Sequence, residues 1–291
     1  MTSKYFKATT ELSLTREMIS SYKRDGFLVI ENAIDLDECQ ALMTRMSELV
    51  ADFDVSEHRS VFSSVTNEQK DDSYFLDSGG EIRYFFEKDA FDDDGKLTVS
   101  KEQALNKVGH ALHDLDPVFN QFSRQKKFET LVTALGMQQP QLLQSMYIFK
   151  QPRIGGEVVC HQDSPFLWTE PQSCIGLWFA LEDATLENGC LWGIPGEHTE
   201  INPRARMMRT GINQAELKVL DDNPWPEDKR VPLEVKAGTL VVLHGQFPHL
   251  SGPNTSDKSR HAYAVHLIDG ACHYPKENWL QRPTNFPITG F

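Results

Sequence analysis

The second half of the 291-residue chain constrains the fold most strongly, because it consists of short β-rich runs. Each run is dominated by Val, Ile, Leu and aromatic residues, and Gly, Pro or Asn residues separate it from the next. This spacing is typical of antiparallel strands joined by turns. The runs cover residues 142–150, 174–181, 190–194, 231–235, 239–243 and 261–268.

The first half of the chain is predicted to be mostly helical. Thr15 to Arg24 predicts a helix, with Thr15 as its N-cap and Gly26 just past its end. A second helix is expected over 35–54, where Asp35 and Glu38 form a capping box. The other predicted elements are strands at 26–30 and 82–86, a helix from Ser100 to about Asp114, a helix from Asp116 to Leu135 closed by Gly136, and a long surface insertion at 202–228.

Helices followed by antiparallel strands predict a mainly β fold with flanking helices, namely a jelly roll, the cupin-like double-stranded β-helix. The chain shows no linker and no internal repeat. We therefore expect a single domain over residues 1–291. Its parts would be a helical N-terminal buttress at about 1–137 and a β-roll core at about 138–270.

Composition excludes several classes of partner. The formal net charge of −13 argues against nucleic acid or an anionic membrane as the main partner, since both require a basic surface. Five scattered cysteines predict reduced thiols, and no stretch approaches the ~18 apolar residues of a membrane span. The N-terminus lacks a secretory signal, so we expect a cytoplasmic monomer that binds a small molecule.

The run 158–163 ends in a histidine and a carboxylate two positions apart. In an extended backbone His161 and Asp163 project to the same side, where both can reach one metal ion. A third ligand, His249, follows the predicted strand 239–243. Two His and one carboxylate that leave open positions are the pattern of non-haem Fe(II) oxygenases. The alternative for the pair alone is a surface histidine beside a solvated aspartate.

Arg260 opens the last predicted strand, eleven residues after His249. A buried arginine requires an anionic partner, and a dicarboxylate would supply one that suits the guanidinium fork. Ser251 can add a hydroxyl donor. The alternative for Arg260 is a surface residue that pairs with Asp257 or another acid.

These motifs together resemble the phytanoyl-CoA dioxygenase family of Fe(II)/2-oxoglutarate oxygenases. The resemblance rests on several ordered motifs and extends over nearly the whole chain. They are His161-Gln162-Asp163, the run Asn188 to His198, His249 with Arg260 beyond it, and the flanking segments 24–29, 144–150 and 277–280.

The resemblance implies a role for eight residues. It implies that His161, Asp163 and His249 bind Fe(II), and that Arg260 and Ser251 bind the distal carboxylate of 2-oxoglutarate. It also implies that the cosubstrate pocket is lined by Lys107, Met146 and Trp178. Without the resemblance, Lys107 fits a solvated helix face, and Met146 and Trp178 fit ordinary core positions.

The resemblance further implies that 2-oxoglutarate and O₂ are consumed, that succinate and CO₂ are released, and that a C–H bond is hydroxylated. Because Asp163 is present, the halogenase variant of this site, which lacks the carboxylate, is disfavoured. The substrate is expected to be apolar or acyl-CoA-like, although the acidic chain gives a CoA ester little support. Two alternatives stay open: a non-catalytic metal-binding β-roll, and desaturation or cyclisation on the same fold.

Overall fold

A large, mostly antiparallel sheet forms the centre of the computed structural model, which describes residues 4–9, 11–55, 59–62, 64, 72–199 and 203–291. Among the named strands of the described residues, β1 pairs in parallel with its neighbour β2, and the other neighbouring strands of the large sheet pair antiparallel. In spatial order the strands are β1 (Tyr5–Lys7), β2 (Phe27–Glu31), β12 (Leu240–His244), β7 (Ile175–Ala180), β14 (Ala262–Asp269), β5 (Pro140–Ile148), β4 (Leu105–His110) and β3 (Ile82–Phe86), with β15 (Thr289–Gly290) paired to β5.

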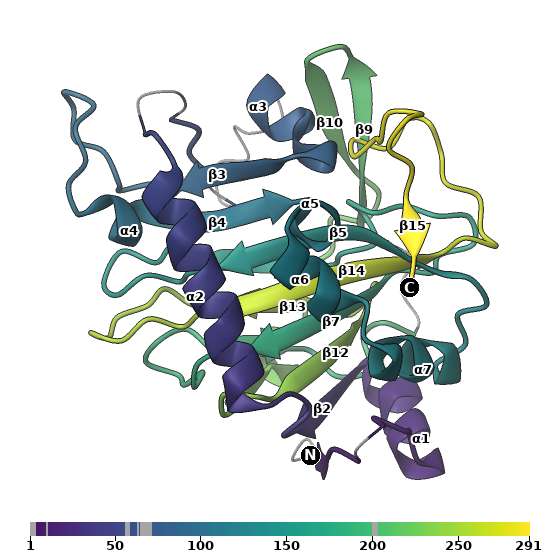
Figure 1. The fold of residues 1–291 in the computed structure, drawn as a ribbon. Coiled ribbons are helices and arrows are strands. Elements are labelled where there is room, and N and C mark those ends of the chain that lie inside the picture. The colour runs from purple at the N-terminus through teal and green to yellow at the C-terminus, as the bar shows by residue number, and fades with distance from the viewer. Residues whose placement is uncertain (1–3, 10, 56–58, 63, 65–71, 200–202) are drawn as a thin grey trace.

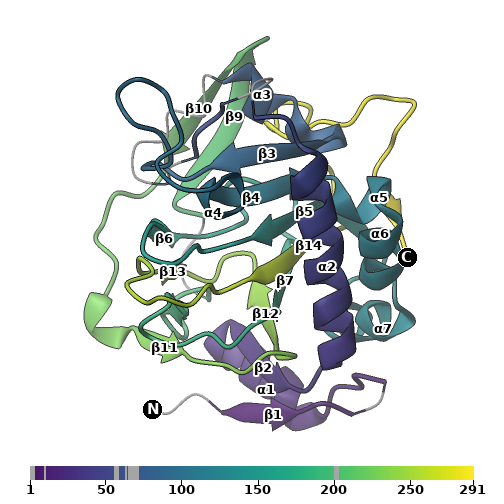
Figure 2. The ribbon, with the colours of Figure 1, turned by 60° about the vertical axis from the view of Figure 1, so that its left-hand side comes forward.

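A second, smaller sheet faces the large one. Its strands, in order, are β11 (Val231–Leu233), β8 (Leu191–Gly193), β13 (His249–Ser251) and β6 (Val158–His161). Figure 2 shows this sheet on the side of the large sheet opposite helix α2. Two facing antiparallel sheets of this kind form a jelly roll, so the predicted fold class is confirmed.

Helices cover the other face of the large sheet (Figure 1). Strand alternation sends Tyr147, Phe179 and Tyr263 to the helical side, and Trp178 and Ala264 to the side of the small sheet. Two hydrophobic layers therefore lie on opposite faces of one sheet. The helices on the covered face are α2 (Leu36–Asp52), α5 (Leu112–Leu115), α6 (Pro117–Ser123) and α7 (Lys126–Ala134).

The predicted caps of the first two helices are confirmed. Helix α1 (Arg16–Asp25) begins after Thr15, whose Oγ1 accepts from Met18 N at 3.2 Å, and it ends at Gly26, where φ is +84°. In α2 the N–H of Asp35 donates to Glu38 Oε2 at 2.8 Å, which completes the capping box. These local signals lie in the sequence itself, because capping depends on residues within one turn.

The prediction of a helix from Ser100 to about Asp114 is wrong. The structure has a single turn, α4 (Lys101–Ala104), then strand β4, then α5. Strand β4 pairs with β3 on one side and β5 on the other, so ladder hydrogen bonds formed with distant segments override the helical spacing of its apolar residues. His110 and His113, which fall within the range of the predicted helix, therefore belong to β4 and α5.

Two other segments differ from the prediction in their secondary structure. The helix predicted over 116–135 is two helices, because α6 ends at Ser123 and α7 begins at Lys126. The predicted surface insertion, of which residue 202 lies outside the described part, contains the hairpin of β9 (Ala205–Gly211) and β10 (Gln214–Val219). Short helical segments also occur at α3 (Ser73–Leu76), η2 (Ser78–Gly80) and η3 (Glu227–Lys229).

The N-terminal half is not only a helical buttress, since β1 to β4 add four strands to the large sheet. A single domain over the whole chain stays a prediction. The five cysteines are free thiols, as predicted. None of the helices in the described part of the chain is long and apolar enough to cross a membrane.

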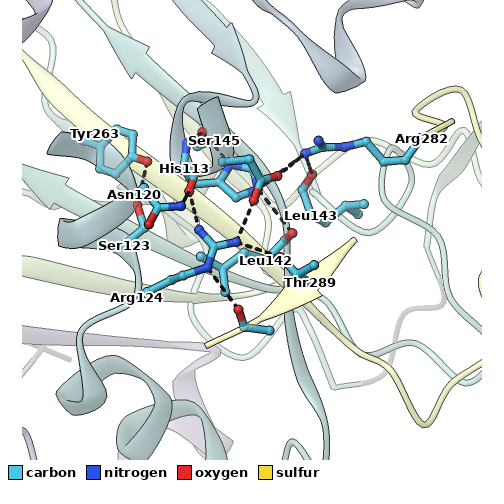
Figure 3. Close-up of polar contacts among 12 residues, drawn as sticks. His113, Asn120, Ser123, Arg124, Leu142, Leu143, Ser145, Tyr263, Arg282 and Thr289 are labelled. Atoms are coloured by element: carbon cyan, nitrogen blue, oxygen red, sulfur yellow. Dashed lines mark hydrogen bonds and ion pairs between the residues drawn. The ribbon is translucent and has the colours of Figure 1, made fainter. Parts of the chain in front are cut away.

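A buried ionic cluster fastens the C-terminal segment to the sheet. The Asp114 carboxylate accepts from Arg124 Nη2 at 2.6 Å and lies 2.9 Å from Arg282 Nη2. Figure 3 shows Arg124 and Arg282 approaching His113 from opposite sides. Burial alone would raise the pKa of Asp114, but His113, Arg124 and Arg282 hold it well below its ordinary value.

Asp114→Asn is expected to lower the free energy of unfolding by about 3–5 kcal/mol, because it leaves two arginines without their carboxylate partner. A depressed carboxyl pKa stabilises the fold above the unfolded value of ~4, and this contribution is lost as the pH falls below it. Urea unfolding at pH 7 and at pH 3 measures both effects. Equal stability of the variant and the wild type at pH 7 would contradict the assignment.

Candidate active site

Three predicted ligands come together between the two sheets. Strand β13 pairs with β6 so that His249 lies opposite His161, with ring centroids 4.3 Å apart. Asp163 lies in the bend just after β6, with Oδ1 3.7 Å from His161 Nε2 and 3.8 Å from His249 Nε2. Their ligand atoms all lie within 4.8 Å of one another, a separation that suits one metal ion.

Both histidines present Nε2 toward this point because Nδ1 is engaged elsewhere. His161 Nδ1 donates to Val159 O at 2.9 Å, and His249 Nδ1 donates to Phe247 O at 3.0 Å. These bonds to carbonyls two residues earlier fix the tautomer and the ring orientation. Burial lowers the pKa of His161 to about 4, so its ring is neutral at pH 7 and Nε2 has a free lone pair.

His266 is a residue of the site that the sequence prediction missed. Its Nε2 lies 3.2 Å from Asp163 Oδ2. Burial would raise the pKa of Asp163, but His266 and His249 hold it below its ordinary value. A signal was present in the sequence, because His266 is an even number of positions from Arg260 on one strand. His261, which has the opposite parity, bonds the Tyr147 hydroxyl instead.

Gln162, between the two ligands of the His-Gln-Asp motif, holds the surrounding backbone together. It is buried, and its Nε2 donates to Gln246 O at 2.8 Å in the loop that precedes His249. Its Oε1 accepts from Arg204 N at 2.9 Å, at the base of the β9–β10 hairpin. One side chain therefore connects the segment between the candidate ligands His161 and Asp163 to the loop before His249 and to the hairpin.

A small cavity of about 150 Å³ extends from the three ligands. All the residues predicted to bind the cosubstrate line it, although they come from five different strands or loops. They are Lys107, Met146, Trp178, Ser251 and Arg260.

Arg260 lies in this cavity as a buried cation and is only 2% exposed. Its Nε donates to Gly189 O at 3.2 Å, its guanidinium carbon lies 5.3 Å from the Trp178 ring centre, and its Nη1 has no hydrogen-bond partner among the described residues. The alternative pairing with Asp257 is wrong, since Asp257 pairs with Arg153. An anionic ligand in the cavity would satisfy this guanidinium, which fits a dicarboxylate.

Ser251 and Lys107 differ in how well they are already paired. Ser251 Oγ has only long contacts, 3.4 Å to Gly189 O and to Gly252 O. Lys107 is not on a solvated helix face but on β4, 6% exposed, with its Nζ 3.2 Å from the Phe62 ring centre. Burial lowers the pKa of Lys107 to about 7.

A larger cavity of about 390 Å³ opens on the other side of the ligands, and His161 and Asp163 line both cavities. Its walls are mostly apolar and aromatic, including Phe75, Phe166 and Trp279. Deep in the cavity lie Lys107, His110, Gln144 and His266, and near the hairpin lie Arg204, Asp221, Asp222, Asn223 and Trp225. The volume lies within the ~300–1,000 Å³ of small-molecule sites.

Three further histidines outside the candidate ligand set have structural partners. His110 Nδ1 lies 2.6 Å from Ser78 Oγ, and His113 contacts Ser145 and the carbonyl of Leu142. His198 Nε2 donates to Lys23 O at 3.2 Å, the backbone contact expected from its turn.

Comparison with known proteins decides the family. Residues 22–262 match the family described as "Phytanoyl-CoA dioxygenase (PhyH)". The chain belongs to the phytanoyl-CoA dioxygenase family. It is 47% identical to "Phytanoyl-CoA dioxygenase" of Arabidopsis thaliana, covering 93% of this chain and 94% of that protein. It is 46% identical to "Phytanoyl-CoA dioxygenase domain-containing protein 1" of Mus musculus, covering 94% and 97%.

As a member of the phytanoyl-CoA dioxygenase family, the chain is a 2-oxoglutarate-dependent oxygenase, a class that uses Fe(II), 2-oxoglutarate and O₂. Solved structures support the fold. The "non-heme alpha ketoglutarate dependent carbocyclase SnoK" has a TM-score of 0.66 at 18% identity, covering 97% of this chain and 99% of that one. "EctD from S. alaskensis with 2-oxoglutarate and 5-hydroxyectoine" has a TM-score of 0.61 at 17% identity, covering 96% of this chain and 87% of that one.

His161→Ala and Asp163→Ala are each expected to weaken Mn(II) binding by more than the ~100-fold that loss of an outer-shell partner can cost. Mn(II) titration followed by electron paramagnetic resonance measures this affinity. The matched control is His273→Ala, because His273 is an exposed histidine outside the site. Equal Mn(II) affinity in the His161 and His273 variants would show that His161 is not a ligand.

Lys107→Met is expected to stabilise the protein by roughly 1–4 kcal/mol at pH 7, because it removes a buried cation that has no carboxylate partner among the described residues. The folded pKa of about 7 lies below the unfolded value of ~10.4, so between these values the unfolded chain binds more protons. The gain should therefore shrink as the pH rises from 7 to 10. Urea unfolding measures it, with the exposed Lys126→Met as control. A Lys107 variant less stable than wild type would contradict the burial argument.

Proposed function

We propose that the chain hydroxylates a small, largely apolar organic molecule, with His161, Asp163 and His249 binding Fe(II). When bound, iron and 2-oxoglutarate supply the oxidising chemistry, with succinate and CO₂ as coproducts. The observation that supports this best is the unpaired Arg260 in a cavity shared with the three candidate ligands. The proposal extends to Ser251, Lys107, Met146 and Trp178 as cosubstrate contacts.

The chain's own residues perform three tasks in this proposal. Nε2 of His161, Nε2 of His249 and a carboxylate oxygen of Asp163 would provide the metal donors. Arg260 and Ser251 bind the distal carboxylate, so the keto-acid end is directed toward the ligands. Trp178 and Met146 form apolar walls that exclude water from the small cavity.

The larger cavity is the proposed substrate site. Its mostly apolar walls favour an apolar or ring-bearing molecule, and Gln144 can orient a polar group of that molecule near His266. A CoA ester is disfavoured, because the hairpin side carries Asp221 and Asp222, and Arg204 lies 3.7 Å from Asp221. Several phosphate charges would find no free cation among these residues.

A non-catalytic metal-binding β-roll is the second candidate function, but it gives no reason for an unpaired arginine in the ligand cavity. Desaturation or cyclisation on the same residues would share the iron and cosubstrate sites and differ only in the product. Succinate release with Fe(II) separates the first candidate from the enzyme. Untargeted comparison of cell extract treated with wild type and with Asp163→Ala identifies the product.

Arg260→Ala is expected to raise the 2-oxoglutarate concentration needed for half-maximal succinate release by about 30-fold or more, since a buried charged contact is worth ~2–5 kcal/mol. Metal affinity should be unchanged. The control is Arg153→Ala, because Arg153 is exposed and pairs with Asp257. An unchanged cosubstrate requirement in the Arg260 variant would refute the assigned role.

A further inference from the structure

Lys150 is a buried cation to which the proposed chemistry gives no role. It lies two residues beyond β5, directly across from Arg260, because the register pairs Ile148 with Ala262 and Arg260 N donates to Lys150 O at 3.3 Å. Lys150 is 3% exposed and lines the same small cavity as Arg260.

Two cations placed this way repel each other. Residues opposite each other on antiparallel strands share a face, and like charges there are destabilising. Lys150 Nζ donates to Gly156 O at 2.6 Å and Arg260 Nε donates to Gly189 O, so the described partners of both are neutral carbonyls. Neither cation is paired with a carboxylate of the described residues.

The nearest compensating acid is held at one remove. Glu87 is 1% exposed, and its Oε2 accepts from Gly156 N at 3.1 Å, so Gly156, whose carbonyl accepts from Lys150, lies between the two side chains. Burial lowers the pKa of Lys150 to about 7, with Arg260 adding to the effect, and burial raises the pKa of Glu87. Glu87 and Lys150 therefore interact only across Gly156, and no carboxylate of the described residues bonds Arg260 directly.

Lys150, Ser251 and Arg260 converge on Gly189. A Cβ on Gly189 would lie 2.7 Å from Lys150 Cε and 2.8 Å from Gly252 O, so the lysine chain packs directly on this backbone. Ser251 Oγ and Arg260 Nε both approach Gly189 O. The end of the small cavity is therefore built around two cations and a hydroxyl.

We propose that Lys150 binds the distal carboxylate of 2-oxoglutarate together with Arg260 and selects dicarboxylates over 2-oxo acids that lack the second charge. This inference rests on the proposed function. A carboxylate has lone pairs enough to accept from both cations, and its charge removes their repulsion. Gly156, Glu87 and the β5–β14 register hold the ammonium at this end of the cavity.

The test is calorimetric titration of the Mn(II)-loaded full chain with 2-oxoglutarate and with 2-oxoglutaramate, whose distal group is an uncharged amide. Lys150→Met should weaken 2-oxoglutarate binding roughly 10-fold or more and leave the amide unaffected. Lys150→Gln keeps a donor for Gly156 O without the charge and should behave the same, which covers a Met variant that fails to fold. The control is Lys236→Met, on an exposed lysine.

Three outcomes separate this inference from the proposed function. Wild-type affinity for 2-oxoglutarate in the Lys150 variants, with loss in Arg260→Met, would overturn the role of Lys150 and leave the proposed function intact. Equal weakening of both ligands would also overturn it, since a merely structural residue does not distinguish the distal charge. A wild-type protein that binds neither ligand would overturn the proposed function itself. If both cations bind one carboxylate, the variant with both Lys150→Met and Arg260→Met should lose less free energy of 2-oxoglutarate binding than the sum of the two single losses.

Discussion

The backbone pairing of β13 with β6 is the constraint on which the site depends. It sets His249 opposite His161 although 88 positions separate them in the sequence. In each ring Nδ1 donates to the backbone carbonyl two residues earlier, so Nε2 is left facing the candidate metal position. Asp163 follows β6 immediately, and Gln162 connects its loop to the loop that precedes His249. A one-residue slip in this pairing would turn one histidine to the opposite face of the sheet.

The β5–β14 ladder contributes lining residues to both cavities. Its cavity face begins with Gln144 opposite His266 at the larger cavity and ends with Lys150 opposite Arg260 at the smaller one. Met146 lies between them and lines both cavities. The same two strands therefore carry an apolar middle and polar ends. In the proposed function this arrangement places substrate and cosubstrate on either side of the metal ligands.

Features that depend on interactions between residues close together in the sequence could be predicted, whereas features that depend on pairing between distant segments could not. Helix caps at Thr15 and Asp35 were predicted correctly, because capping is local. The strand runs and the three metal-ligand candidates were also found, since alternation and motif order are visible in the chain. Lys107 was placed on a helix because apolar residues there have helical spacing. Pairing of β4 with β3 and β5 decides that segment, and such pairing is not visible locally.

Residues that act only through tertiary contacts were the ones missed. His266 belongs to none of the motifs, and Lys150 is only the last residue of the flanking segment 144–150; the structure brings His266 opposite Gln144 and Lys150 opposite Arg260. The hairpin β9–β10 was expected to be a surface insertion, yet Met207 and Leu217 form part of the larger cavity's wall. In each case the residue is recognised as a functional candidate because it is buried next to an ionisable group or a cavity. Burial depends on the whole fold, so it cannot be predicted from neighbouring residues alone.

A crystal structure of the protein with Mn(II) and 2-oxoglutarate tests the proposed site most directly. We expect the ion to be bonded to His161, Asp163 and His249, with the distal carboxylate of the cosubstrate between Arg260 and Ser251. An ion bound at other residues, or a cosubstrate whose distal carboxylate lies away from Arg260, would contradict it.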